Sequence, residues 1–127
     1  MLTITLITAG ILGLMFVWLS VRVIQGRVKD DVLIGDQGHI GLEFLIRTHG
    51  NFTEFTPLFL ILLGLNEMAG AAAGWLVSLA ALFVLARFSH VAGMSEGANL
   101  KFRQAGIAGS FTAIILSSFS GFYLALF

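Results

Sequence analysis

The sequence predicts an all-α integral membrane protein folded as a four-helix bundle, because its composition and its distribution of charges both argue against a soluble domain. Only 11% of the 127 residues are charged and 57% are hydrophobic, whereas soluble domains average about 25% charged residues. Three stretches, residues 1–21, 68–86 and 104–127, contain no charged side chain. A helix needs about 20 apolar residues to cross the hydrocarbon core of a bilayer, so each stretch supplies one span.

The same composition excludes several other classes of protein. The chain has no cysteine, which rules out a disulfide-stapled fold and a thiolate metal site. We expect no histidine metal site either, because His39, His49 and His90 do not stand at a spacing typical of metal ligands. Seven basic and seven acidic residues leave no cationic excess for binding nucleic acid.

The chain is expected to form one domain with four spans, at about residues 1–22, 42–66, 70–92 and 103–127. The first span has no basic residue before its apolar run, unlike a signal peptide, so we expect a retained helix. Basic side chains gather in the first connection, at Arg27 and Lys29, and in the third, at Lys101. The positive-inside rule places both connections in the cytoplasm and both termini outside it.

The second span differs from the others because its uncharged part is short. Residues 55–66 are too few to cross a bilayer. Extending the helix back to Leu42 supplies the length but includes Arg47 and Glu54. Each charge near the membrane centre costs about 3 kcal/mol or more. These side chains must therefore face a bundle interior, a partner subunit or the cytoplasmic interface.

The polar residues of the second span form one stripe. Arg47, Asn51 and Glu54 stand at i, i+4 and i+7, so they fall within about 60° of one another on a helix. His49 points about 200° away from Arg47, and Glu43 extends the stripe by one turn. One interpretation is a structural ladder in which Glu43, Arg47 and Asn51 only satisfy one another and hold helices together.

A second set of polar residues lies where the third span ends and the fourth begins. Arg87 and His90 are one turn apart, and Arg103 precedes a run rich in small residues, 105–110, that would let helices pack closely. Taken singly, Arg87 is typical of a side chain that snorkels to the membrane edge. His90 is typical of an interface histidine bonded to a backbone carbonyl, and Arg103 of a positive-inside anchor.

Taken together, these groups predict a cationic pocket at the cytoplasmic ends of the helices. Such a pocket suits a small anion that carries several carboxylates and one ammonium group. Arginine binds a carboxylate in a bidentate fork, and an embedded acid such as Glu54 can hold the ammonium. The members of the predicted pocket are Arg22, Arg47, Asn51, Glu54, Arg87, His90 and Arg103.

The second span also resembles the signature of the MAPEG superfamily, the membrane-associated proteins in eicosanoid and glutathione metabolism. The motif reads Arg47-x-His49-x-Asn51-x-x-Glu54, followed by Pro57. The third span adds the family's Arg-x-x-His at 87–90, and Arg103 stands where the family places an arginine at the start of its fourth helix. The resemblance covers essentially the whole chain.

The resemblance implies a homotrimer, in a bacterial inner membrane, that binds glutathione between neighbouring subunits near the cytoplasmic side. It implies a glutathione S-transferase or peroxidase acting on lipophilic electrophiles that enter from the surrounding membrane lipids. It also implies that Arg103 is the catalytic residue and stabilises the glutathione thiolate. The residues implied to hold the tripeptide are Arg47, Asn51, Glu54, Arg87 and His90, with Arg22 supplied by the adjacent subunit.

The chain departs from the well-known members of the family at three positions. It carries Met94 and Ile107 in place of tyrosines in the third and fourth helices, and Gln104 in place of a serine. These departures are typical of a divergent bacterial-type branch. They favour a second interpretation, in which the trimer is catalytically silent and serves as a binding or structural membrane protein. A third, a small multidrug exporter, is less favoured because such exporters place an acid in their first helix, and residues 1–21 contain none.

Overall fold

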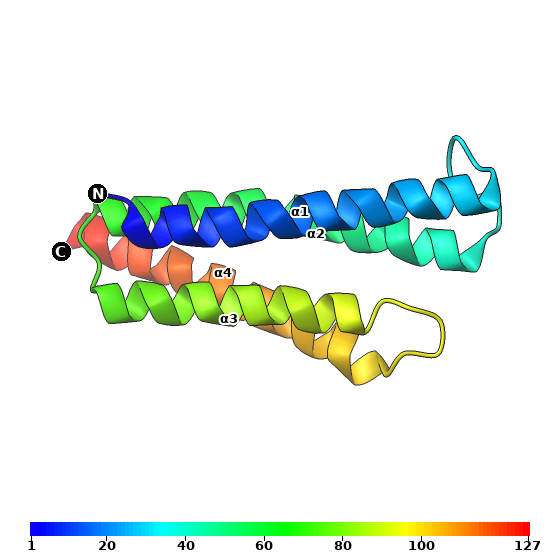
Figure 1. Cartoon of the computed structure of the whole chain (residues 1–127). Helices are drawn as coiled ribbons and strands as arrows, with labels where there is room; N and C mark the ends of the chain where they lie inside the picture. The colour runs from blue at the N-terminus through cyan, green and yellow to red at the C-terminus, as the bar shows by residue number, and fades with distance from the viewer.

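Four long helices form an antiparallel bundle in the computed structural model, which describes all 127 residues (Figure 1). They are α1 (Thr3–Asp30), α2 (Ile40–Met68), α3 (Ala73–Ala92) and α4 (Leu100–Leu126). The chain contains no strand, which confirms the predicted all-α fold. By length and composition α1, α3 and α4 can each cross a membrane, whereas α2 does not reach the same apolarity. The polar stripe thus sets α2 apart, as the sequence predicts.

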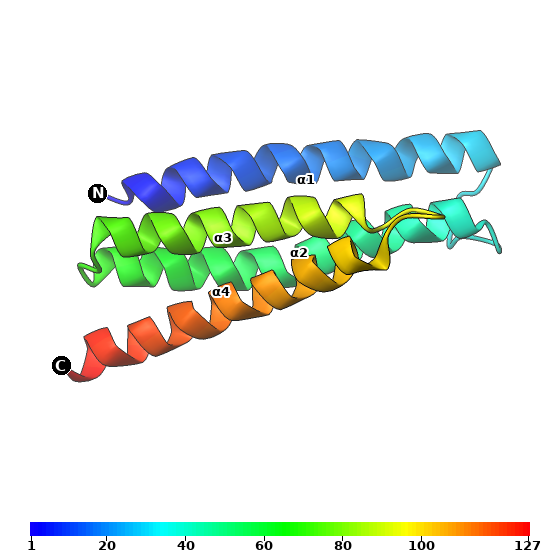
Figure 2. The ribbon, with the colours of Figure 1, turned by 90° about the horizontal axis from the view of Figure 1, so that it is seen from below.

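The ends of the helices are sorted to two sides of the bundle. Both termini lie at one end, and the α1–α2 and α3–α4 connections lie together at the other (Figure 1). Seen from below, α4 diverges from the other three helices toward its C-terminus (Figure 2). The basic connections therefore share one end of the molecule, which we call the connection end.

The first helix is longer than the span expected from the absence of charge. α1 continues past residue 22 and ends at Asp30, so only residues 31–39 connect it to α2. In this extended part Gly26 lies directly against α2, where an added Cβ would stand 2.8 Å from Leu45 Cδ1. Two basic side chains in the last turn of α1 also interact favourably with the C-terminal end of the helix dipole.

Apolar side chains fill the middle of the bundle and set how α2 faces α3. The rings of Phe59 and Phe83 stack with their centroids 4.0 Å apart, and neither is exposed to solvent. Leucines of α1, α2 and α3 surround them. Because Phe83 lies one turn before Arg87, this stack fixes the position of α3 beneath the polar turns of α2.

Small residues bring α4 very close to α3, which confirms the packing role expected for the run at 105–110. An added Cβ on Gly106 would lie 2.5–2.6 Å from backbone atoms of His90, and one on Gly109 would lie 2.9 Å from Ala86 Cβ. Gly93 packs equally closely against the backbone of Arg103. This contact places the last turn of α3 beside the first turn of α4.

Candidate functional site

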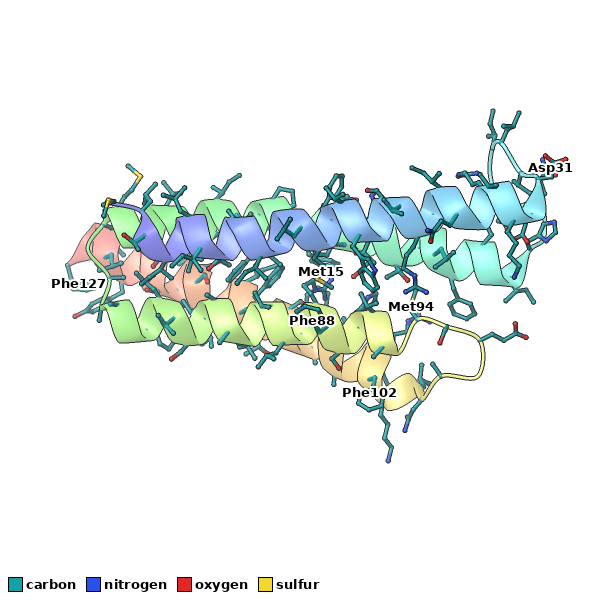
Figure 3. The ribbon with its side chains drawn as sticks, in the orientation of Figure 1. Met15, Asp31, Phe88, Met94, Phe102 and Phe127 are labelled. Carbon is teal, nitrogen blue, oxygen red and sulfur yellow. The ribbon has the colours of Figure 1, made fainter.

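A polar cavity of about 240 Å³ lies at the connection end, between α2, the end of α3 and the start of α4. Met94 lines this cavity and lies just past the end of α3, at the start of the α3–α4 connection (Figure 3). Four residues of the predicted pocket line this cavity, together with the two residues that replace tyrosines of the family that the sequence resembles. The lining residues are Ile40, Glu43, Phe44, Arg47, Asn51, His90, Met94, Arg103 and Ile107.

The local structure of each helix brings these polar side chains together. Arg47 and Asn51 are one turn apart on α2, and His90 stands in the last turn of α3. The Asn99 side chain caps α4 by accepting a hydrogen bond of 3.0 Å from the Lys101 backbone N–H. This cap fixes the first turn of α4, which carries Arg103.

Arg87 does not line the cavity but is buried directly beneath it. Its side chain is only 1% exposed, so the interpretation that it snorkels to the membrane edge is wrong. One guanidinium nitrogen donates to Asn51 Oδ1 at 2.7 Å, and the other donates to the Gly106 carbonyl at 3.1 Å and to Ser110 Oγ. The rings of Phe55 and of a second phenylalanine, Phe83, lie about 5.6 and 5.5 Å from the guanidinium carbon.

The cations of the cavity have no acidic partner within the chain. The one ion pair in the structure joins His39 Nδ1 and Asp30 Oδ2 at 3.8 Å, in the first connection. Glu43 lines the cavity, yet it forms no ion pair with Arg47 or Arg103. The ladder interpretation requires Glu43, Arg47 and Asn51 to bond one another, and the subunit contains none of those contacts.

Two predicted binding residues, Glu54 and Arg22, lie outside the cavity of the single subunit. Glu54 is exposed on α2, one turn beyond Asn51. Arg22 is half-buried on α1, where its guanidinium carbon lies 5.1 Å from the Trp18 ring centroid. The subunit alone therefore does not bring these two side chains to the other pocket residues.

His49 belongs to a separate contact between α1 and α2. Its Nε2 lies 3.0 Å from Ser20 Oγ, and its ring centroid lies 5.2 Å from that of Phe16. Ser20 Oγ also donates to the Phe16 carbonyl at 2.9 Å, so the hydroxyl accepts the hydrogen bond from His49. This placement agrees with the expectation that His49 points away from the stripe.

Sequence reasoning missed the apolar part of the cavity wall on α2. Ile40 and Phe44 line the cavity with Arg47 and Asn51, and the four stand at alternating spacings of four and three residues. The helical period that predicts the polar stripe therefore also predicts that these two residues lie on the same face. Extending the stripe toward the start of the helix would have identified them.

Comparisons with known proteins agree with the architecture. The family model described as the MAPEG family matches residues 5–123. The chain is 30% identical over 105 residues to Inner membrane protein YecN of Escherichia coli strain K12, and this alignment covers 82% of the chain and 79% of the relative. The protein of the same name from Escherichia coli O6:H1 matches with the same identity and coverage. No solved structure gives a significant match.

Proposed function

Because the chain belongs to the MAPEG family, we propose that it is a glutathione-dependent membrane transferase or peroxidase that binds glutathione in the cavity at the connection end. The observation that carries this proposal is the convergence of Arg47 and Arg103 on one cavity, with neither guanidinium paired to a carboxylate of the chain. Two unpaired guanidinium groups suit a ligand that brings its own anionic groups, here a carboxylate for Arg47 and a thiolate for Arg103. Glutathione has two carboxylates, one ammonium and one thiol.

Each polar residue then has a distinct role toward the tripeptide. Arg47 binds a carboxylate, and Asn51 and His90 complete the polar wall of the cavity. Glu54 holds the ammonium at the boundary of the subunit, and Arg22 reaches the ligand of a neighbouring subunit. Arg87 supports the site from below through its hydrogen bond to Asn51.

Arg103 supplies the catalytic electrostatics. Glutathione contributes a thiol, whose ordinary pKa of about 8.5 leaves it mostly protonated at neutral pH. The guanidinium of Arg103 is always charged and favours the thiolate, which is the reactive nucleophile. Lipophilic electrophiles reach the site from the membrane lipids, while glutathione enters from the aqueous side.

An outward face of α2 supports assembly into a homotrimer. It follows alternating spacings of four and three residues over the whole helix, the pattern by which helices pack into coiled coils. Every member is exposed or half-buried in the single subunit, so this face has no complete partner. We call it the α2 seam: Ile40, Phe44, Arg47, Asn51, Glu54, Leu58, Ile61, Leu65 and Met68.

The size of the cavity also supports a shared site. Ligand pockets usually measure about 300–1,000 Å³, and the cavity of one subunit measures about 240 Å³. Because Arg47 and Asn51 belong to both the cavity and the α2 seam, packing of a second subunit on the seam would enlarge and enclose the site. It would also bring Glu54 into a subunit contact.

We expect native mass spectrometry in mild detergent to show three copies at micromolar protein concentration. The double change Ile61→Ala and Leu65→Ala removes apolar side chains that are 59% and 57% exposed on the seam, and it should shift the population toward monomer. Leu85→Ala is the control, because this leucine is 67% exposed on α3, away from the seam. A wild-type protein that is only monomeric under these conditions would contradict the trimer.

The orientation proposed for the protein places both termini outside the cytoplasm. The connection end carries the basic residues Arg27, Lys29 and Lys101, whereas both termini lie at the opposite end (Figure 1). The positive-inside rule places such basic connections in the cytoplasm. A reporter enzyme that is active only outside the cytoplasm should therefore be active when fused after Phe127. Activity of a cytoplasm-specific reporter at the same position would contradict this orientation.

One observation favours the alternative of a catalytically silent trimer. Met94 and Ile107 both line the cavity, so the two hydroxyl groups that the family resemblance implies are absent from the cavity wall itself. A site with these apolar side chains can retain affinity for the tripeptide while losing donors that would help to hold a reacting thiolate.

Isothermal titration calorimetry with glutathione, combined with ultraviolet absorbance of the thiolate against pH, tests the proposal on the purified oligomer. We expect saturable binding and a thiolate signal at neutral pH. Binding without that signal would favour the silent trimer. Absence of binding to the intact oligomer would contradict glutathione binding and leave only the structural form of the silent trimer.

A further inference from the structure

A fully buried arginine with no acidic partner is the most unusual feature beneath the cavity. Burying an uncompensated charge is costly, and Arg87 is 1% exposed with only neutral groups as partners. Its Nε has no hydrogen-bond partner at all. An aspartate in place of Asn51 would give this guanidinium a carboxylate in a nearly unchanged shape. The chain instead carries the neutral amide.

The contact between Arg87 and Asn51 determines which end of the amide meets the cavity. A guanidinium group can only donate hydrogen bonds, so the atom 2.7 Å from Arg87 must be the carbonyl oxygen of Asn51. The NH₂ group of the same amide is therefore turned away from Arg87. It makes no hydrogen bond within the chain, and Asn51 lines the cavity, so the NH₂ group is available to a ligand as a donor.

Ser110 holds the guanidinium in the orientation that this arrangement needs. Ser110 is completely buried, and its hydroxyl donates to the Gly106 carbonyl at 2.7 Å. The hydroxyl therefore accepts a hydrogen bond from Arg87. The same guanidinium nitrogen also donates to the Gly106 carbonyl. Since α4 closely approaches α3 at Gly106, this anchor lies where the two helices are tightly packed.

We propose that Arg87 and Ser110 are positioning residues that lock the Asn51 amide with its NH₂ group toward the cavity, and that this polarity makes the site select ligands rich in hydrogen-bond acceptors. The inference rests on the proposed function, because it treats the cavity as the binding site of a carboxylate-bearing ligand. Arg87 acts on the ligand through Asn51 and does not touch it. The neutral amide is kept at the expense of a stabilising ion pair.

The change Asn51→Asp separates a positioning role from a merely structural one. The new carboxylate should pair with Arg87 and raise the melting temperature of the protein, because a buried charge gains a counter-ion. It also replaces a donor at the cavity wall with an acceptor, so glutathione affinity should fall at least about tenfold, the loss expected for a charge-assisted hydrogen bond. Opposite shifts in stability and affinity are the signature of the proposed role.

Two further variants keep the test decisive. Asn99→Asp makes the same amide-to-acid change at the exposed cap of α4, outside the cavity. Aspartate caps a helix about as well as asparagine, so the turn that carries Arg103 stays in place and affinity should remain within about twofold of wild type. Ser110→Ala removes only the buried anchor, and it should weaken glutathione binding although Ser110 does not line the cavity. Both variants are measured by calorimetry and by thermal unfolding in the same detergent.

The outcomes distinguish failure of this inference from failure of the proposed function. If wild-type protein does not bind glutathione, the proposed function itself fails. If wild type binds and Asn51→Asp binds equally well, or if Asn99→Asp loses affinity as strongly as Asn51→Asp, the donor role of the amide is overturned. If Ser110→Ala binds like wild type, Ser110 is not a positioning residue.

Discussion

Replacement of Arg47 by alanine should weaken glutathione binding by about ten- to hundredfold. Arg47 faces the cavity and is paired with no carboxylate of the chain, so its guanidinium is free to bind a ligand carboxylate. Losing a hydrogen bond to a charged group typically costs about 1.5–3 kcal/mol, and each 1.4 kcal/mol is about tenfold in affinity. Because no internal ion pair is broken, the change should leave thermal unfolding nearly unaltered. Calorimetry on the purified oligomer measures the loss.

Lys101→Ala provides the control for this experiment. Lys101 is an exposed cation in the first turn of α4, two residues before Arg103, and it does not line the cavity. Removing it tests whether affinity follows the overall positive charge of the connection end. An equal loss in both variants would mean that Arg47 acts only through long-range attraction. Unchanged affinity in Arg47→Ala would mean that Arg47 does not bind the ligand.

The polar stripe of α2 illustrates what a single sequence can predict. The spacing of Arg47 and Asn51 placed both on one face, and a charged face in an otherwise apolar chain requires a partner. In the structure the two residues line one cavity together with His90 and Arg103. The helical period and the positions of the charges were sufficient for this prediction, because both can be read from the sequence of one helix or of the ends of adjacent helices.

Arg87 shows where the same reasoning fails. A basic residue at the end of an apolar run is typical of membrane-edge anchoring, and its sequence neighbours give no sign of the groups that surround it. Its partners come from α2 and α4, through Asn51, Gly106 and Ser110. Which residue lies beneath the cavity depends on how closely α4 packs on α3, a tertiary property set by glycine contacts.

The positions of Arg22 and Glu54 could not be predicted from the sequence for a different reason. Both were expected in the pocket, yet one stacks on Trp18 along α1 and the other is exposed on the α2 seam. The geometry of one subunit does not bring them to the cavity. In the proposed trimer they would act across the subunit contact, so their roles depend on assembly and not on the fold of the single chain.

Replacement of Arg103 by alanine should abolish the thiolate signal at neutral pH while leaving most of the binding affinity. Arg103 lines the cavity opposite α2 and has no acidic partner, so its positive charge favours a bound thiolate. Without it, the pKa of the bound thiol should rise toward about 8.5, and ultraviolet thiolate absorbance should appear only at alkaline pH. Turnover of a lipophilic electrophile should fall by about 10²-fold or more, the loss typical of removing one group that stabilises a developing anion.

Arg103→Lys is the conservative comparison, because an ammonium keeps the charge but not the planar fork of a guanidinium. It should restore part of the thiolate signal at neutral pH, since charge alone lowers the thiol pKa. Calorimetry on the same samples separates a catalytic role from a binding role. If Arg103→Ala abolishes binding while wild type shows no thiolate at neutral pH, Arg103 binds a carboxylate of the ligand and the catalytic assignment is wrong. If the variant retains both binding and thiolate, another polar group that lines the cavity, such as His90, stabilises the anion.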